Sequence, residues 1–282
     1  MTSPVVALAR KDLADAARSK LMWGLTAVLL VVTVPSFAGT VGSSFISGPA
    51  DAVEWLPGVF QNFVAPVAMI AAYRSVVGER ESGSIRTLFG HPVTRGEFIA
   101  GKLLGRVALV GVVLAVGMLA LGGVVVATYG TLPVALFVAV TAYVVAYGAV
   151  WTAITVGVSA AVSSRLQAIA VMLGLFLFFG PFTLWQTFGL GAAALVATGR
   201  PSTAAIDPID PATWPDWYLY AQRLNPMRNF EMTREFAASL GDPTIGYFGA
   251  VEVQVFGLAA LVAWAAVPLA AGYWRFERAD LG

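Results

Sequence analysis

The sequence predicts an all-α membrane protein with six transmembrane helices, an amphipathic interfacial helix at its N-terminus and both termini in the cytoplasm. Of its 282 residues, 58% are hydrophobic and only 12% are charged, whereas soluble domains usually carry about a quarter charged residues. Long uncharged stretches also recur along the chain, and ~20 apolar residues suffice for a helix to cross the bilayer core. We therefore expect a single transmembrane domain over residues 1–282, with lipid as its main solvent.

Six spans follow from the positions of the uncharged stretches. The longest stretch, between Arg106 and Arg165, is interrupted at Thr128–Pro133, where Tyr, Gly and Pro favour a tight turn at the membrane surface. This stretch is therefore expected to form a helical hairpin. The expected spans cover residues 21–41, 57–77, 104–127, 134–160, 168–190 and 250–274.

Lys and Arg residues are divided unequally between the two sides that six spans define. The N-terminus, the loop 78–103, the loop 161–167 and the C-terminus share one side, which holds 13 of the 17 Lys and Arg residues. Because cytoplasmic loops carry an excess of basic residues, this side is predicted to be cytoplasmic. The segment 191–249 is then extracytoplasmic, where its Trp and Tyr residues suit anchoring at the membrane surface.

Residues 1–20 are predicted to contain an amphipathic helix that lies along the inner leaflet. Apolar side chains recur on one face of residues 4–20, and charged side chains occupy the remainder of the helix surface. The apolar face consists of Val5, Ala9, Leu13 and Ala16, and the charged residues are Arg10, Lys11, Asp12, Arg18 and Lys20.

The loop 78–103 is charged and is expected to contain short helices. Apolar residues recur at helical spacing between Ile85 and Phe89, and Pro92 then breaks the helix because it lacks the backbone N–H. Thr94 is a candidate N-cap with Glu97 as its capping-box partner, so a new helix should start there. Short charged helices suit docking to a cytoplasmic partner, and a solvated loop between helices fits the same pattern.

This loop resembles the corresponding segment of ABC type-2 exporter permeases. The matching residues are Glu79, Gly83-Ser84, Leu88, Pro92-Val93, Arg95 and Gly101-Lys102-Leu103-Leu104-Gly105. The likeness extends to the basic N-terminal helix, to Leu224-Asn225-Pro226 and to the tail from Phe276 to Leu281. Within the family the sequence is most similar to the subgroup that includes the permease of the nitrous-oxide-reductase accessory transporter. Ser84 stands where the family more often has Thr.

The resemblance implies a permease subunit of the cell membrane that is not itself an enzyme. Such a subunit pairs with a second permease chain and with cytoplasmic ATPase subunits, which hold ATP and magnesium. The segment 79–97 would carry ATP-driven motion into the spans. The family's re-entrant elements also suggest a role in gating substrate exit for the segment 191–249, as the alternative to anchoring. The residues expected to make this coupling contact are Glu79, Arg80, Glu81, Gly83, Arg86, Pro92 and Arg95. No cofactor is expected on this chain, and its net charge of +1 gives no reason to expect a nucleic-acid partner.

Residues 96–103 match a phosphate-binding P-loop at all but the last position. Leu103 stands where the Mg²⁺-binding hydroxyl of Ser or Thr would be required, and no apolar strand precedes the motif. The segment is therefore not expected to bind nucleotide. Lys102 is interpreted instead as a marker of the inner membrane interface that extends toward lipid phosphates.

Away from the ends of the predicted spans, the polar residues within them are hydroxyls and amides. Hydroxyl side chains recur on one face of the fourth span and of the first span, where they suit helix packing through interhelical hydrogen bonds. They also suit a substrate path across the membrane. The candidate residues for such a path are Thr152, Thr155, Ser159, Thr33 and Ser36.

Two other functional classes fit the sequence less well. An ion-coupled secondary transporter usually keeps ionisable residues within its spans, and the predicted spans carry none near their centres. An intramembrane enzyme needs a base near its nucleophile, and the single histidine, His91, lies in the predicted loop. The absence of cysteine and the single histidine also exclude thiolate and paired-histidine metal sites. The sequence leaves the transported substrate open.

Overall fold

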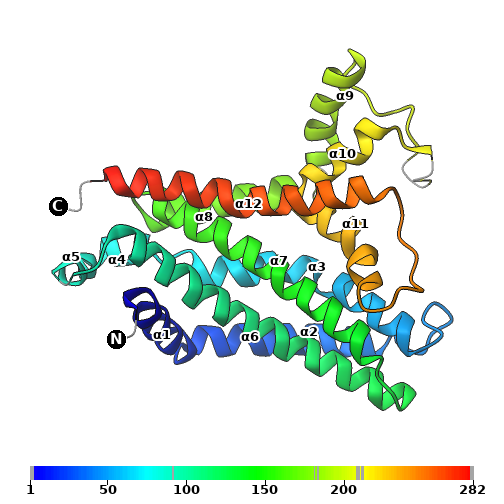
Figure 1. Ribbon diagram of the computed structural model, residues 1–282, viewed down its shortest axis with the longest axis horizontal. Helices are drawn as coiled ribbons and strands as arrows, with labels where there is room; N and C mark the ends of the chain where they lie inside the picture. The colour runs from blue at the N-terminus through cyan, green and yellow to red at the C-terminus, as the bar shows by residue number, and fades with distance from the viewer. Residues whose placement is uncertain are drawn as a thin grey trace.

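The computed structural model describes residues 3–90, 92–180, 182, 184–207, 210 and 213–279, without the side chains of Leu21, Arg86 and Phe89. Within this part of the chain every regular element is a helix, as the sequence predicts. The long helices lie side by side along the longest axis of the molecule (Figure 1). The first helix and the end of the last helix lie at the same end of this bundle, beside the two short helices of the loop 78–103.

The bundle consists of α1 (Pro4–Ala17), α2 (Lys20–Ala38), α3 (Pro49–Ala72), α6 (Arg95–Tyr129), α7 (Val134–Ala161), α8 (Arg165–Phe179) and α12 (Val251–Arg278). The short helices α4 (Val77–Glu81) and α5 (Ser84–Phe89) connect α3 to α6. The segment between α8 and α12 contains a π-helical turn (Trp185–Gly189), α9 (Leu190–Thr198), α10 (Asp216–Leu224) and α11 (Pro226–Ser239).

Four helical segments of the described chain are long and apolar enough to cross a bilayer, which identifies an integral membrane protein. They are the segment Pro49–Glu81, α6, α7 and α12. A fifth candidate arises only if α1 and α2 are counted as one span, although the two helices are bent by 64°. The described residues thus contain four or five candidate spans rather than the six expected.

The expected span 168–190 is interrupted in the structure. Helix α8 has 15 residues and ends at Phe179, so it is shorter than the ~20 residues that a span requires. Gly180 follows it with an extended backbone, and a Cβ atom there would collide with the carbonyl oxygen of Phe176. The π-helical turn and α9 follow in place of a continuous helix. The segment is therefore apolar enough for a span, but its backbone does not form one continuous helix.

The ends of α6 lie where capping residues predict them. The Thr94 hydroxyl accepts a hydrogen bond from the backbone N–H of Glu97 at 3.2 Å, and the Glu97 carboxylate accepts one from the Thr94 N–H at 2.8 Å. This completes the predicted capping box. At the other end Gly130 adopts a left-handed conformation with φ of 73°, which favours glycine. The predicted turn between α6 and α7 is thereby confirmed.

Helices α7 and α12 cross in close contact through two glycines. A Cβ atom on Gly272 would collide with the carbonyl oxygen of Gly157, and one on Gly157 would collide with that of Pro268. The two backbones therefore touch directly, as they do where small residues line the crossing of membrane helices. This contact fixes α12 along the C-terminal half of α7, next to the end of the bundle that carries α4 and α5.

Helices α10 and α11 form a hairpin that enters the bundle from the opposite end (Figure 1). Phe230 of α11 stacks on Tyr147 near the middle of α7, with ring centroids 4.1 Å apart. Beside the tip of the hairpin, Trp264 of α12 donates a hydrogen bond to the carbonyl oxygen of Leu224 at 2.9 Å. The segment 191–249 therefore reaches the middle of the helix bundle and is not confined to its surface.

The hairpin also carries charged side chains among the long helices. Arg223 is 1% exposed and donates hydrogen bonds to the Thr233 hydroxyl at 2.8 Å and to the Gln254 side chain at 3.2 Å. Arg228 pairs with Glu231 at 2.5 Å. The expectation that polar groups within the bundle are hydroxyls and amides does not extend to this hairpin.

Gly157→Val is expected to prevent the close crossing of α7 and α12, because the new side chain would occupy the position of the Pro268 carbonyl group. Overpacking typically costs about 1–3 kcal/mol, and a clash with backbone should cost at least that much. The midpoint temperature of unfolding in detergent should fall by several degrees, or folded protein should be lost altogether. Gly123→Val is the matched control, since no atom lies within 4 Å of a Cβ there. Equal stability of the two variants would contradict the crossing.

Candidate functional site

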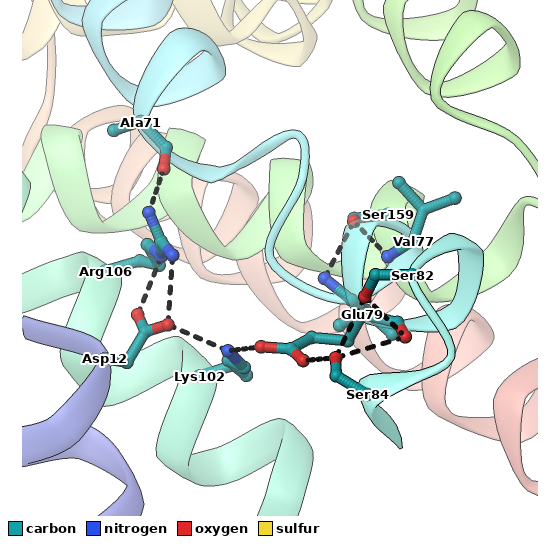
Figure 2. A network of polar contacts seen from close by, with 10 residues as sticks. Asp12, Ala71, Val77, Glu79, Ser82, Ser84, Lys102, Arg106 and Ser159 are labelled. Atoms are coloured by element: carbon teal, nitrogen blue, oxygen red, sulfur yellow. Dashed lines mark hydrogen bonds and ion pairs between the residues drawn. The ribbon is translucent and has the colours of Figure 1, made fainter. Parts of the chain in front are cut away.

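A network of charged side chains joins α1, α4 and α6 at the end of the bundle that carries α5 (Figure 2). Lys102 of α6 lies between two carboxylates, with its Nζ atom 2.9 Å from Asp12 and 2.8 Å from Glu79. Arg106, one helical turn further along α6, pairs with the same Asp12 through its Nε atom at 2.7 Å. Two anions and two cations therefore form a neutral group, which we call the charge network.

The charge network is largely withdrawn from solvent. The side chain of Asp12 is 4% exposed, and those of Lys102 and Arg106 are 11% and 19% exposed. Burial of an unpaired ion costs several kcal/mol, so mutual pairing is the condition under which these groups can be buried. The Arg106 guanidinium also donates a hydrogen bond to the carbonyl oxygen of Ala71 at 2.7 Å, which links the network to the end of α3 (Figure 2).

Two glycines of α6 allow α1 to come close enough for this pairing. A Cβ atom on Gly101 would lie 2.6 Å from the Cβ atom of Leu8, and one on Gly105 would lie 3.0 Å from the backbone oxygen of Ala9. The four-residue spacing puts both glycines on one face of the helix. The motif Gly101–Gly105 thus forms a shallow recess for α1, and Lys102 lies beside it.

The structure corrects the interpretation of Asp12 and Lys102. Periodicity assigns Asp12 to the charged surface of the N-terminal helix, but Asp12 lies with Ala16 on the buried face of α1. Lys102 does not extend toward lipid phosphates, because its ammonium group pairs with two carboxylates of the protein. A usable signal was present: Lys102 and Arg106 lie one turn apart on a mostly apolar helix, where buried cations require counter-charges.

The residues that match a P-loop belong to a continuous helix. Residues 96–102 lie within α6, so the segment has none of the loop backbone that cradles phosphates. This agrees with the interpretation that the segment does not bind nucleotide. Its glycines and Lys102 instead serve the contact with α1 and the charge network.

Ser159 connects α7 to the segment between α3 and α4, close to the charge network. Its Oγ atom accepts hydrogen bonds from the N–H groups of Val76-Val77 at 3.1 Å each and donates to the Tyr73 carbonyl group at 2.8 Å. Ser159 therefore satisfies backbone groups where the chain passes from α3 to α4. Beyond that point Glu79 accepts a hydrogen bond from the hydroxyl of Ser84 in α5 (Figure 2).

Further predicted coupling residues surround α4. Arg80 donates a hydrogen bond to the Val162 carbonyl oxygen at 2.9 Å. Glu81 pairs with Arg165, the first residue of α8. Gly83 lies between α4 and α5 with φ of 73°, a left-handed conformation that favours glycine.

The remaining predicted coupling residues lie further along the loop. Arg95 donates hydrogen bonds to backbone carbonyl groups at the end of α12, including that of Phe276 at 2.6 Å. Pro92 is exposed between α5 and α6. Arg86 belongs to α5, and its side chain lies outside the described part of the chain. The structure thus gathers these residues at one end of the bundle, and their contact with an ATPase stays a prediction.

The predicted substrate-path hydroxyls are mostly bonded within the protein. Thr152, Thr155 and Thr33 are buried, and each donates to a carbonyl oxygen one turn back in its own helix at 2.7 Å. Ser159 holds the α3–α4 connection as described above, and Ser36 is exposed on α2. The three threonine bonds stay within their own helices, and among these five residues Ser159 alone has a described hydrogen bond to another segment. Both the packing role and the substrate path stay predictions.

Comparison with known proteins identifies a family that the sequence matches. The model of a family described as ABC-2 family transporter protein matches residues 6–281. The probable ABC transporter permease protein NosY of Pseudomonas aeruginosa is 33% identical over 111 residues, which are 36% of this chain and 39% of that protein. The protein of the same name from Stutzerimonas stutzeri is 30% identical over 117 residues, 40% of either chain. The matched region thus spans about two fifths of the length of each curated relative.

Asp12→Asn should destabilise the protein, because the substitution leaves Lys102 and Arg106 without the carboxylate that they share. Removing one partner of a buried ion pair costs about 3–5 kcal/mol, so the midpoint temperature of unfolding in detergent should fall by several degrees. Asp15→Asn changes an exposed residue of the same helix and should leave the midpoint unchanged. Equal midpoints for the two variants would show that the charge network does not hold α1 in place.

Proposed function

Because the chain belongs to the ABC-2 family of transporter proteins, we propose that it is the membrane-spanning permease subunit of an ATP-driven exporter in the cell membrane. The match of the family model to nearly the whole chain is the observation that carries this proposal. The permease provides the path across the bilayer, and separate cytoplasmic subunits bind and hydrolyse ATP with magnesium. The end of the bundle that carries the charge network faces the cytoplasm, in agreement with the distribution of Lys and Arg.

In this proposal α4 and α5 receive the motion of the ATPase, and Glu79 transmits it. The Glu79 carboxylate is bonded to α5 through Ser84 and to α6 through Lys102. A displacement of α4 therefore carries α6 with it through Lys102, and α1 follows because Lys102 also holds Asp12. Switching between two states then requires that the contacts between this unit and the rest of the bundle differ in the two states, because a ligand shifts an equilibrium only by its differential affinity for them.

Two copies of the permease and two ATPase subunits form the proposed assembly. Large apolar side chains are exposed along α2, α6, α8 and α12, and a membrane protein covers such faces with lipid or with another chain. The transported substrate stays open. The polar residues at both ends of the bundle do not identify it.

An ion-coupled carrier is the alternative, and one observation favours it. The hairpin brings Arg223, Arg228 and Glu231 among the long helices, and intramembrane charges are frequent in carriers that move protons or ions. Family membership favours the ATP-driven exporter. The two proposals differ in the partner that each requires.

Purification of the tagged chain from its native host in mild detergent tests the proposal. The exporter proposal predicts a stoichiometric cytoplasmic ATPase, with ATP hydrolysis that depends on the permease. If the chain purifies alone as a stable oligomer and transports without ATP, the exporter proposal fails and the ion-coupled carrier takes its place.

Glu79→Ala is expected to reduce the permease-dependent ATP hydrolysis of the complex by about tenfold, which equals ~1.4 kcal/mol of coupling free energy. The substitution breaks the link from α4 to Lys102, while Asp12 still pairs with both cations. Membrane insertion and co-purification of the ATPase should therefore persist, and both are measured on the same preparation. Glu252→Ala, at an exposed site at the far end of α12, is the control. Unchanged hydrolysis in the Glu79 variant would remove this residue from the coupling path.

A further inference from the structure

A second polar region lies at the same end of the bundle, outside the charge network. It is a cavity of about 490 Å³ between α4, the start of α8 and the end of α12. Arg80 of α4 and Arg275 of α12 line it, together with Gln167 near the start of α8. Val171, one turn further along α8, gives the cavity an apolar wall. Its lining therefore combines basic and polar groups with an apolar wall on the side of α8.

The positive charge of this cavity has no carboxylate partner among the described residues. Arg80 donates a hydrogen bond to a backbone carbonyl group, and neither Arg80 nor Arg275 takes part in the ion pairs of that part of the chain. The neighbouring carboxylate of Glu81 pairs with Arg165, and that of Glu277 accepts a hydrogen bond from Tyr273 at 3.4 Å. The two guanidinium groups are therefore available to an anionic ligand.

Gln167 adds a neutral donor to the same lining. Its side-chain oxygen accepts hydrogen bonds from the backbone N–H and the hydroxyl of Ser163 at 3.0 and 2.9 Å. In the described contacts its NH₂ group has no acceptor, so it can serve a ligand in the cavity. Two guanidinium groups and an amide donor together suit the oxygen atoms of a phosphate group.

We propose that this cavity binds an anionic phospholipid of the inner leaflet, with its phosphate group between Arg80 and Arg275 and its chains against Val171. The assignment to the inner leaflet rests on the proposed function, in which the end of the bundle that carries the charge network faces the cytoplasm. Basic pockets between transmembrane helices on the cytoplasmic side are a recurring form of anionic-lipid site. Arg275 belongs to the last turn of α12, where the headgroup region of a bilayer meets such a span.

The apolar wall favours a lipid over an ATPase surface as the occupant. Val171 is the seventh residue of α8, a helix whose exposed residues from Leu166 to Leu177 are largely apolar. A soluble ATPase subunit stays in water and contacts only the basic rim, whereas a phospholipid fills both parts. A bound lipid would also join α4 to α8 and α12, and would thereby restrain the segment that contains Glu79.

The test compares lipids of different headgroup on the purified full-length chain. Native mass spectrometry counts retained lipid, and thermal unfolding reports stabilisation, as phosphatidylglycerol or phosphatidylcholine is added in detergent. A third sample receives inorganic phosphate alone. The proposal predicts that phosphatidylglycerol is retained and raises the midpoint temperature, while the other two additions have little effect.

Arg275→Gln should weaken the retention of phosphatidylglycerol by about fivefold, the contribution of one basic residue near an anionic lipid. Arg275 is exposed, so the variant should unfold at the wild-type temperature when no lipid is added. Arg278→Gln is the matched control on the same helix, because Arg278 lies over the ring of Trp274, 3.9 Å from its centroid, and does not line the cavity. The control should retain the lipid as the wild type does.

Three results would overturn the proposal. Equal losses in the Arg275 and Arg278 variants would reduce the effect to general surface charge. Inorganic phosphate as effective as phosphatidylglycerol would indicate a site for a free anion. Displacement of the lipid when the ATPase binds would assign the cavity to the partner protein, whereas retention in the complex supports the lipid site. The retention and unfolding measurements on the purified chain require neither the ATPase nor transport, so their outcome is separate from that of the exporter proposal.

Discussion

The pairing of Asp12 and Glu79 with Lys102 and Arg106 is the interaction on which the organisation of one end of this protein depends. Buried ion pairs contribute little net stability, but separating them is costly because each ion is then left without a counter-charge. If α1 or α4 moved away from α6, Lys102 would lose one of its two carboxylate partners, although its side chain is only 11% exposed to solvent. The charge network therefore favours one arrangement of these three helices. Gly101 and Gly105 make that arrangement sterically possible, since they let the backbone of α1 approach α6.

Local sequence signals predicted much of this fold, because the physics that they report is local. Hydropathy identified the helices that became α3, α6, α7 and α12, and the capping box at Thr94 marked the start of α6. The turn at Gly130 followed from residue types that favour left-handed backbone and tight turns. Glu79 was also recognised as a residue of the candidate site, through its place in a family motif. Lys102, which pairs with Glu79 in the structure, was not predicted to belong to the site.

Local sequence signals could not predict the long-range contacts. The pairing of Asp12 with Lys102 and Arg106 spans about 90 residues, and helical periodicity alone placed Asp12 on the solvent side. Composition likewise could not show that the segment 168–190 breaks at Gly180, because its residues are apolar on both sides of the break. The depth of the α10–α11 hairpin depends on the stacking of Phe230 against Tyr147, which joins segments far apart in the chain. The errors at Asp12 and in the α10–α11 hairpin arose where tertiary contact outweighed local pattern, whereas the break at Gly180 lies in the local backbone.

We propose that the charge network makes α1, α5 and α6 move as one unit when the proposed ATPase partner acts. Distances between spin labels test it most directly, because the chain contains no cysteine and labels can be attached at introduced ones. Arg10, Thr87 and Val134 are exposed positions on α1, on α5 and at the far end of α7. When nucleotide binds the complex with its ATPase, the distance between labels at Arg10 and Thr87 should stay constant while both distances to Val134 change. Movement of Thr87 relative to Arg10 would contradict the account.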